Sequence, residues 1–191
     1  MSSGAATRAE LMRVARDLFA ERGYAGVGTE EIVARANVTR GALYHHFADK
    51  KALFRAVHEE LEQELMAQVG EEIAGIEDPW ELAVTGVRAF LDACTDGALR
   101  QIALIDAPAV LGWEEWREID ARYGLGLVTF GLRNGMDAGV FRERDVTPLA
   151  HLLIGAMTEA ALMVANASDP DAARREAEPA LLALLEGLRS D

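Results

Sequence analysis

Apolar residues recur every three or four positions along nearly the whole chain, a period that predicts amphipathic α-helices. Polar residues occupy the opposite side of each stripe, and no segment shows the strict alternation that is typical of a β-strand. The pattern therefore predicts an all-α protein. The expected helices cover residues 7–22, 29–36, 40–47, 52–69, 80–95, 99–111, 113–135, 147–168 and 171–188.

Residues that cap or interrupt helices separate these segments. Gly23 and Asn37 tolerate the left-handed conformation and are expected to end the first two helices. Thr29 and Thr39 are expected to cap the second and third helices, because hydroxyl side chains accept hydrogen bonds from the first free N–H groups. Pro108 is expected to start or kink a helix. The glycines at positions 124, 126, 131, 135 and 139 predict a bend or break in the helix over residues 113–135.

The second and third helices are short and are joined by a three-residue turn, which is typical of a helix-turn-helix whose second helix enters the major groove of DNA. Gly41 and Ala42 would let the third helix approach the groove floor, and Arg40, Tyr44 and His45 are long enough to reach it. The alternative is an exposed helix in which the small residues are incidental.

Composition narrows the class of protein. The chain has 191 residues, of which 50% are hydrophobic and 27% are charged, as expected of a soluble globular protein rather than a disordered or membrane protein. One cysteine, Cys94, cannot form an internal disulfide, and no signal peptide is apparent, so we expect a cytoplasmic protein.

The net charge of −13 argues, taken as a whole, against a nucleic-acid partner. Residues 1–55, however, carry nine Lys and Arg against six Asp and Glu, a net charge of +3, whereas the remainder carries ten against 26, a net charge of −16. This asymmetry predicts two parts with different roles, of which only the first suits DNA.

The N-terminal segments resemble the TetR family of transcriptional regulators in order and spacing. The resemblance covers about 50 residues and its combination of motifs is highly specific. It rests on residues 18–24 (LFAERGY), 29–33 (TEEIV), 38–47 (VTRGALYHHF) and 50–54 (KKALF).

The resemblance implies a site on double-stranded DNA. Arg40 is the candidate for direct reading of a guanine, because a guanidinium can bond O6 and N7 together. Thr29 and Lys50 are expected to contact phosphates, Thr39 a phosphate or a thymine methyl group, and His46 to be half-buried. The implied DNA-binding residues are Thr29, Thr39, Arg40, Gly41, Ala42, Tyr44, His45, His46 and Lys50.

The resemblance also implies a fold of two domains. Residues 1–52 would form a three-helix DNA-binding domain, residues 52–69 a connector, and residues 70–191 a larger helical domain for ligand binding and dimerisation. The protein would act as a homodimer on a palindromic operator, with the two subunits paired through the helices at about 147–168 and 171–188. It would be a repressor that a small molecule releases from DNA, and it would need no cofactor and contact no membrane.

The ligand domain offers apolar and polar candidates for the effector site, which leave a hydrophobic and an anionic effector equally open. Cys94 is interpreted as a small core residue, with a redox sensor as the alternative. The candidate ligand-binding residues are Arg88, Phe90, Cys94, Asp106, Trp113, Trp116, Tyr123 and Arg133.

Other functions find weaker support in the sequence. The adjacent His45 and His46 diverge on a helix and do not form a metal site, and the acidic stretch at residues 114–120 lacks the Glu-x-x-His pairs of a di-metal enzyme. We therefore do not expect an enzyme. A DNA-binding protein that responds to no ligand, and that tethers or occludes chromosomal sites, remains the main alternative.

Overall fold

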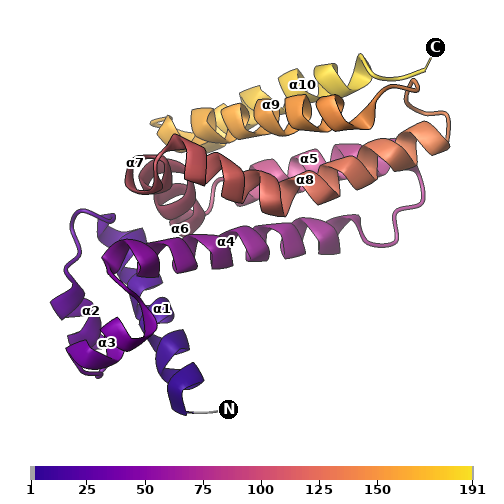
Figure 1. The fold of residues 1–191 in the computed structure, drawn as a ribbon. Helices are drawn as coiled ribbons and strands as arrows, with labels where there is room; N and C mark the ends of the chain where they lie inside the picture. The colour runs from indigo at the N-terminus through magenta and orange to yellow at the C-terminus, as the bar shows by residue number, and fades with distance from the viewer. Residues whose placement is uncertain (1–2, 191) are drawn as a thin grey trace. The chain divides into compact units, whose positions relative to one another are not determined.

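The structure is a computed structural model that describes residues 3–190, and its regular elements are helices (Figure 1). The prediction of an all-α fold is confirmed, and the described residues contain no strand beyond one isolated bridge between Phe141 and Arg189. The elements are α1 (Ser3–Arg22), α2 (Thr29–Arg35), α3 (Arg40–His46), α4 (Lys50–Ile73), α5 (Pro79–Ala93), α6 (Gly97–Leu99), the π-helix η1 (Arg100–Asp106), α7 (Ala107–Leu111), α8 (Trp113–Asp137), α9 (Val146–Asn166) and α10 (Pro170–Glu186).

These helices form two compact units. The first, the N-terminal unit, comprises the residues up to Leu61 together with Gly97–Trp116, and the second, the C-terminal unit, comprises Glu62–Asp96 and the residues from Arg117 onward. The segment Gly97–Trp116 thus belongs with the N-terminal helices, from which it is distant in the sequence.

The core of the N-terminal unit holds the apolar stripes of its helices. Phe19 of α1 lies against Phe54 of α4 with ring centroids 5.3 Å apart, and Tyr24 contacts the same ring at 5.1 Å. Leu43 is fully buried and holds α3 against this core. Burial of apolar side chains of this size provides the main driving force for folding of a small helical domain.

The turns between the short helices agree with the sequence, with one exception. Gly23 has φ +70° and Asn37 has φ +52°, the left-handed conformation predicted for both. Thr39 caps α3 by accepting a hydrogen bond of 3.1 Å from the Ala42 N–H. The prediction for Thr29 is wrong, because α2 begins at Thr29 itself and its N-cap is Gly28, which has no side chain to accept a bond.

Residues 99–111 are helical throughout, as expected, and α6, η1 and α7 follow one another without a gap, the middle part being a π-helix. Pro108 lies in the first turn of α7, directly after η1, and has no N–H with which to continue the hydrogen bonds of the π-helix. The Trp116 indole N–H donates to the carbonyl of Ala103 in η1 at 3.0 Å. Asp106 accepts a hydrogen bond of 2.7 Å from the Tyr24 N–H and so links η1 to the end of α1.

In the C-terminal unit, α10 packs against α9 and α5. Buried Leu91, Ala160 and Leu181 meet at the centre of this contact. The glycines of α8 do not break it, since the helix is continuous over 25 residues, and the prediction of a break is wrong. Gly135 has a packing role instead, because a Cβ atom there would lie only 2.1 Å from the ring of Phe141.

Helix α9 is long and apolar enough to cross a membrane by length and composition alone. It contributes Ala150, Ile154, Ala161 and Val164 to the buried core of the C-terminal unit. Its hydropathy is therefore explained by packing within this unit and by its exposed apolar side chains Leu152 and Met163.

Candidate nucleic-acid interface and ligand cavity

Helix α3 presents a polar face to solvent. Leu43 and, directly after the helix, Phe47 are buried, as their four-residue spacing requires. Four residues on the opposite side are exposed, whereas Ala42 and His46 at the edges are partly buried, the latter as predicted. The exposed residues are Arg40, Gly41, Tyr44 and His45.

Arg40 and Thr39 begin this exposed face. The Arg40 guanidinium lies 5.5 Å from the centre of the Tyr44 ring and 3.8 Å from a carboxylate oxygen of Glu30, and its side chain is 65% exposed. Exposed ion pairs of this length contribute at most about 1 kcal/mol, so Arg40 is readily available to a ligand. Thr39 accepts from the Ala42 N–H, which leaves its own hydroxyl proton able to reach a phosphate.

Gly41 has no side chain, so the backbone of α3 is accessible at this point of the exposed face. A Cβ atom at Gly41 would have a single neighbour within 4 Å, the Thr39 hydroxyl oxygen at 3.8 Å, so the fold has room for a larger residue. Packing of the free protein therefore does not require glycine at this position. Close approach of another molecule to α3 would explain it.

Lys50 differs in its surroundings from the other candidate DNA contacts. Its ammonium group donates to the Tyr24 carbonyl at 2.5 Å and lies 3.9 Å from the centre of the Tyr24 ring. Burial lowers the pKa of Lys50, although the charge of Asp106 partly opposes this shift. Lys50 is thus half-buried and holds the first turn of α4 against the end of α1, and a phosphate contact would compete with this bond.

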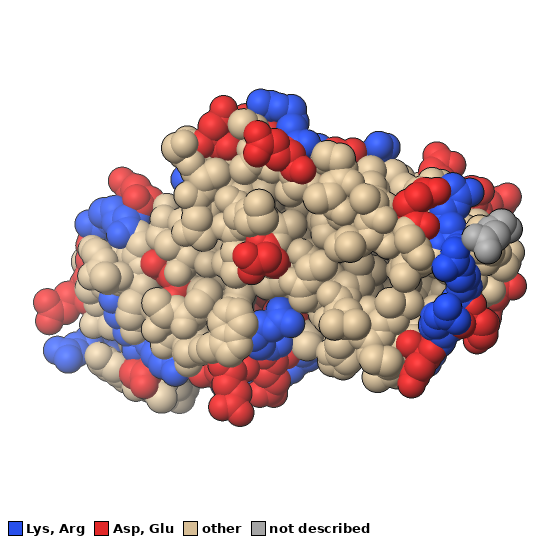
Figure 2. Space-filling model, turned by 90° about the horizontal axis from the view of Figure 1, so that it is seen from above, with Lys and Arg blue, Asp and Glu red and all other residues tan. Residues whose placement is uncertain are grey.

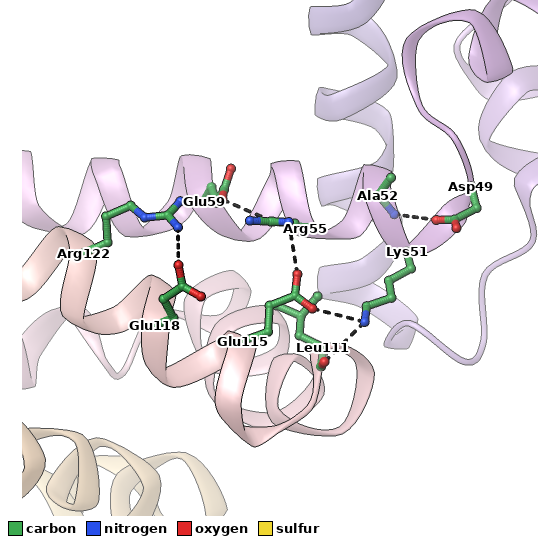
Figure 3. Close-up of polar contacts among 9 residues, drawn as sticks. All are labelled: Asp49, Lys51, Ala52, Arg55, Glu59, Leu111, Glu115, Glu118 and Arg122. Atoms are coloured by element: carbon green, nitrogen blue, oxygen red, sulfur yellow. Dashed lines mark hydrogen bonds and ion pairs between the residues drawn. The ribbon is translucent and has the colours of Figure 1, made fainter.

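The basic residues that follow in α4 also form ion pairs inside the N-terminal unit (Figure 3). Glu115, in the first turn of α8, lies 3.2 Å from Lys51 and 3.2 Å from Arg55. Lys51 also donates to the Leu111 carbonyl at the end of α7. This network fastens the start of α4 to the segment Gly97–Trp116.

Several arginines of α1–α3 are paired with carboxylates of the same helices or of their neighbours. Arg13 lies 2.6 Å from Glu10, and Arg22 lies 2.6 Å from Glu31. A longer pair of 3.9 Å joins Arg35 to Glu21. The positive charge of the predicted DNA-binding domain is thus partly neutralised within the domain.

The C-terminal unit contains two small adjacent cavities among its helices. The larger has a volume of about 70 Å³, is lined by apolar residues and contacts Leu82, Leu132 and Phe141. The smaller, of about 40 Å³, contacts Phe90 together with three polar residues, Glu62, Asp120 and Thr158. Four residues line both cavities and make them neighbours: Val69, Leu127, Val128 and Met157.

The structure does not bring the eight candidate ligand residues together. Phe90 lines the smaller cavity, Arg133 lines an open groove along α8, and Arg88 forms an exposed ion pair of 2.7 Å with Glu178. Asp106, Trp113 and Trp116 belong to the N-terminal unit, where Trp116 is buried and Trp113 is 63% exposed.

Of the remaining candidates, Tyr123 accepts a hydrogen bond of 3.1 Å from Gln63, and Cys94 is 1% exposed. Burial raises the pKa of the Cys94 thiol, so the thiolate that redox sensing needs is disfavoured.

Glu62 is a polar cavity residue that the sequence pattern did not single out. Its spacing within α4 indicated only that it shares a face with Leu65 and Val69, and a carboxyl on an apolar face is the signal that could have identified it. Burial raises the pKa of Glu62 to about 8, and the nearby charge of Asp120 acts in the same direction. Within the described residues, no group of three or more His, Cys, Asp and Glu side chains could hold a metal ion.

Comparison with known proteins agrees with this arrangement. Residues 11–57 match the family model described as bacterial regulatory proteins of the tetR family, and residues 80–188 match the model described as a tetracyclin repressor-like C-terminal domain. The chain belongs to the TetR family. It is a DNA-binding transcriptional regulator with a helix-turn-helix and a helical C-terminal domain, and it is not an enzyme.

Individual known proteins match most of the chain. The crystal structure of a TetR-family regulator from Pectobacterium atrosepticum is 35% identical, with a TM-score of 0.90, and the match covers 100% of this chain and 99% of that one. The Transposon Tn10 TetC protein of Escherichia coli is 28% identical over 84% of this chain and 81% of its own length. The structure of RolR in complex with resorcinol shares the fold at 24% identity, with a TM-score of 0.73 and coverage of 95% and 88%.

Proposed function

We propose that this TetR-family protein is a cytoplasmic repressor that binds a palindromic operator as a homodimer and is released by a small molecule. The observation that carries the DNA-binding part is the exposed face of α3, with Arg40, Tyr44 and His45 on one side of a helix whose other side is buried. A helix of this kind reads base edges in the major groove, and a two-fold dimer places two such helices one helical turn of DNA apart.

Within this proposal, Arg40 reads a base and the remaining candidates position the helix. Tyr44 and His45 contact bases or phosphates, Gly41 and Ala42 permit close approach, and Thr29 and Thr39 donate to phosphates. Lys50 and His46 are assigned a lesser part, because both are half-buried and Lys50 already donates to the Tyr24 carbonyl.

Apolar side chains on the last two helices support the dimer. Leu152 and Met163 of α9 and Leu184 of α10 are 73%, 56% and 56% exposed. Figure 2, which shows the side of the molecule that carries α9 and α10, has a broad area with few charged residues. Exposed apolar side chains on two adjacent helices favour a self-complementary contact of the kind a two-fold dimer needs.

The cavities of the C-terminal unit favour control by a ligand over an unregulated DNA tether. A resorcinol-bound relative, RolR, has the same fold. In our proposal, the ligand binds more tightly to a conformation whose α3 helices no longer match successive major grooves, so that it shifts the population away from the DNA-binding state.

Selection of duplexes from a random DNA pool by the purified protein, at one stated salt concentration, tests the proposal. We expect an enriched inverted repeat, and we expect Arg40→Ala to lower the affinity for it at least tenfold while the thermal midpoint stays within a few degrees. Salt-sensitive binding without an enriched sequence, or unchanged affinity of Arg40→Ala, would contradict the assignment of α3.

A further inference from the structure

The two cavities of the C-terminal unit differ in polarity. Apolar side chains alone contact the larger one, whereas the smaller one meets two carboxyl groups, those of Glu62 and Asp120, and the hydroxyl of Thr158. Among the described residues that line either cavity, none is Lys or Arg. The space is therefore apolar at one end and rich in hydrogen-bond acceptors at the other.

The acceptors are held in place inside the unit. Arg117 donates from one guanidinium nitrogen to Asp120 at 2.6 Å and to Thr158 at 3.0 Å, and Thr158 lies 2.8 Å from the Ile154 carbonyl. Glu62 and Thr158 are each 6% exposed. An anionic group placed here would meet no free basic side chain, since Arg117 is already paired with Asp120 and none of the described residues that line the cavity is Lys or Arg, and it would lie beside two buried carboxyl groups.

We propose that this cavity binds a small apolar amine, whose cationic end lies between Glu62 and Asp120 and whose apolar body extends toward Val128 and Leu132. The inference rests on the proposed function, in which the C-terminal unit holds the effector, and adds the chemical class of that effector. A protonated amine donates to carboxylates, and the ring of Phe90 beside them provides an aromatic surface that attracts cations.

The size of the cavities limits the effector to a small molecule. Their volumes of about 70 and about 40 Å³ are well below those of pockets for drug-sized ligands. Met66 and Met157 line the smaller cavity, and methionine side chains change rotamer readily, so the space can widen to hold one ring. The high pKa of Glu62, about 8, agrees with a carboxyl group that ionises when a cation arrives.

Three probes of similar size but different head groups test the proposal: 2-phenylethylamine, 2-phenylethanol and phenylacetate. We measure their binding to the full-length protein, without DNA, by titration calorimetry and by the shift in thermal midpoint. We expect saturable binding of the amine, at least tenfold weaker binding of the alcohol and no binding of phenylacetate. Equal affinity for amine and alcohol, preference for phenylacetate, or no saturable binding of any probe would overturn the proposal.

Variants of the cavity separate the polar end from the apolar body. Glu62→Gln is expected to lower the ratio of amine to alcohol affinity at least tenfold and to leave the alcohol affinity within about threefold, and Asp120→Asn is expected to act in the same direction. Glu64→Gln, on the exposed side of the same helix, is the matched control and should leave the ratio unchanged. An unchanged ratio in both cavity variants would exclude the assigned position of the cation.

A separate measurement distinguishes this inference from the proposed function. Release of a selected operator duplex is followed with each probe present. Amine binding without release would contradict the ligand-released repressor and leave the chemical class of the ligand standing. Release by phenylacetate or by the alcohol, without release by the amine, would support the ligand-released repressor and contradict the amine as the chemical class of the ligand.

Discussion

Gly41 shows how a single position separates folding from recognition. In the free protein the site has room for a methyl group, and alanine in a helix is more stable than glycine by up to about 1 kcal/mol. At the surface of a DNA groove the same methyl group would hold α3 away from the bases. The two effects of one substitution are therefore expected to have opposite signs.

We predict that Gly41→Ala lowers operator affinity at least tenfold while the thermal midpoint is unchanged or slightly raised. Binding is measured by fluorescence anisotropy with a labelled operator, and stability by thermal unfolding. Gly70→Ala, in α4, is the control, since a Cβ atom at Gly70 has no neighbour within 4 Å and Gly70 is remote in sequence from α3. Full operator affinity of Gly41→Ala would show that α3 does not lie close to the groove floor.

Glu62 gives the protein a predictable response to pH. Its folded-state pKa of about 8 lies above the ordinary value of 4.5, so the folded state holds a proton that the unfolded state loses. Stability should consequently fall as the pH rises through this interval. Burial lowers the pKa of His58 to about 4, which has the opposite effect between that value and 6.5, so the fall is seen best above pH 6.5.

We predict a fall in the free energy of unfolding of about 1 kcal/mol per pH unit between pH 6.5 and 8, followed in urea titrations at several pH values. Glu62→Gln should flatten most of this dependence. A wild-type profile as flat as that of the variant would mean that Glu62 is ionised in the folded protein.

Along helix α8, glycines with the same propensity serve different purposes. Gly135 accommodates the Phe141 ring, whereas Gly126 is exposed and a Cβ atom there would meet nothing within 4 Å. Helix propensity alone would make both substitutions by alanine favourable. Packing reverses the sign at Gly135, because neither the ring nor the helix backbone can yield without disturbing the buried cluster around Leu132 and Met136.

Gly135→Ala is therefore expected to reduce the free energy of unfolding by about 1–3 kcal/mol, and Gly126→Ala to leave it equal or raise it by up to about 1 kcal/mol. Chemical denaturation of the two variants side by side measures the difference. Equal stability of both would show that Phe141 packs elsewhere in solution.

The helices themselves follow from local patterns, whereas the cavity does not. Apolar periodicity and the caps at Gly23, Asn37 and Thr39 are short-range signals, and they place most helix ends within a few residues. The π-helical stretch η1 and the packing of α8 involve tertiary contacts, such as the bond between Trp116 and Ala103 and the ring over Gly135.

The exposed face of α3 could be predicted because its residues lie within one helix. The cavity combines residues from α4, α5, α8 and α9, and only packing determines which of these helices meet around Glu62, although spacing alone places Glu62 on the apolar face of α4 and Glu64 on the opposite side.

As a whole, the protein is expected to depend on dimerisation for its function, since one α3 helix reads only half of a palindrome. Replacing both Leu152 and Leu184 by Glu places charges on the exposed apolar surface of α9 and α10 without disturbing buried residues. We predict a monomer in analytical ultracentrifugation and operator affinity reduced at least a hundredfold. Phe130→Glu, which alters an exposed apolar side chain of α8, is the control and should stay dimeric.

The ion pairs among α1–α3 also affect how the protein responds to salt. A basic residue that neutralises a DNA phosphate displaces a condensed cation, and each such event steepens the fall of affinity with salt by about 0.9 in logarithmic slope. Arg13, Arg22, Arg35 and Arg40 already have carboxylate neighbours in the free protein. An arginine that leaves Glu30 or Glu31 to pair with a phosphate gains less electrostatic attraction than an unpaired arginine would. The fall of DNA affinity with salt concentration should therefore be shallower than the nine basic residues of residues 1–55 would predict. Hydrogen bonds to bases then account for a larger share of affinity, and discrimination between operator and random DNA persists as ionic strength rises.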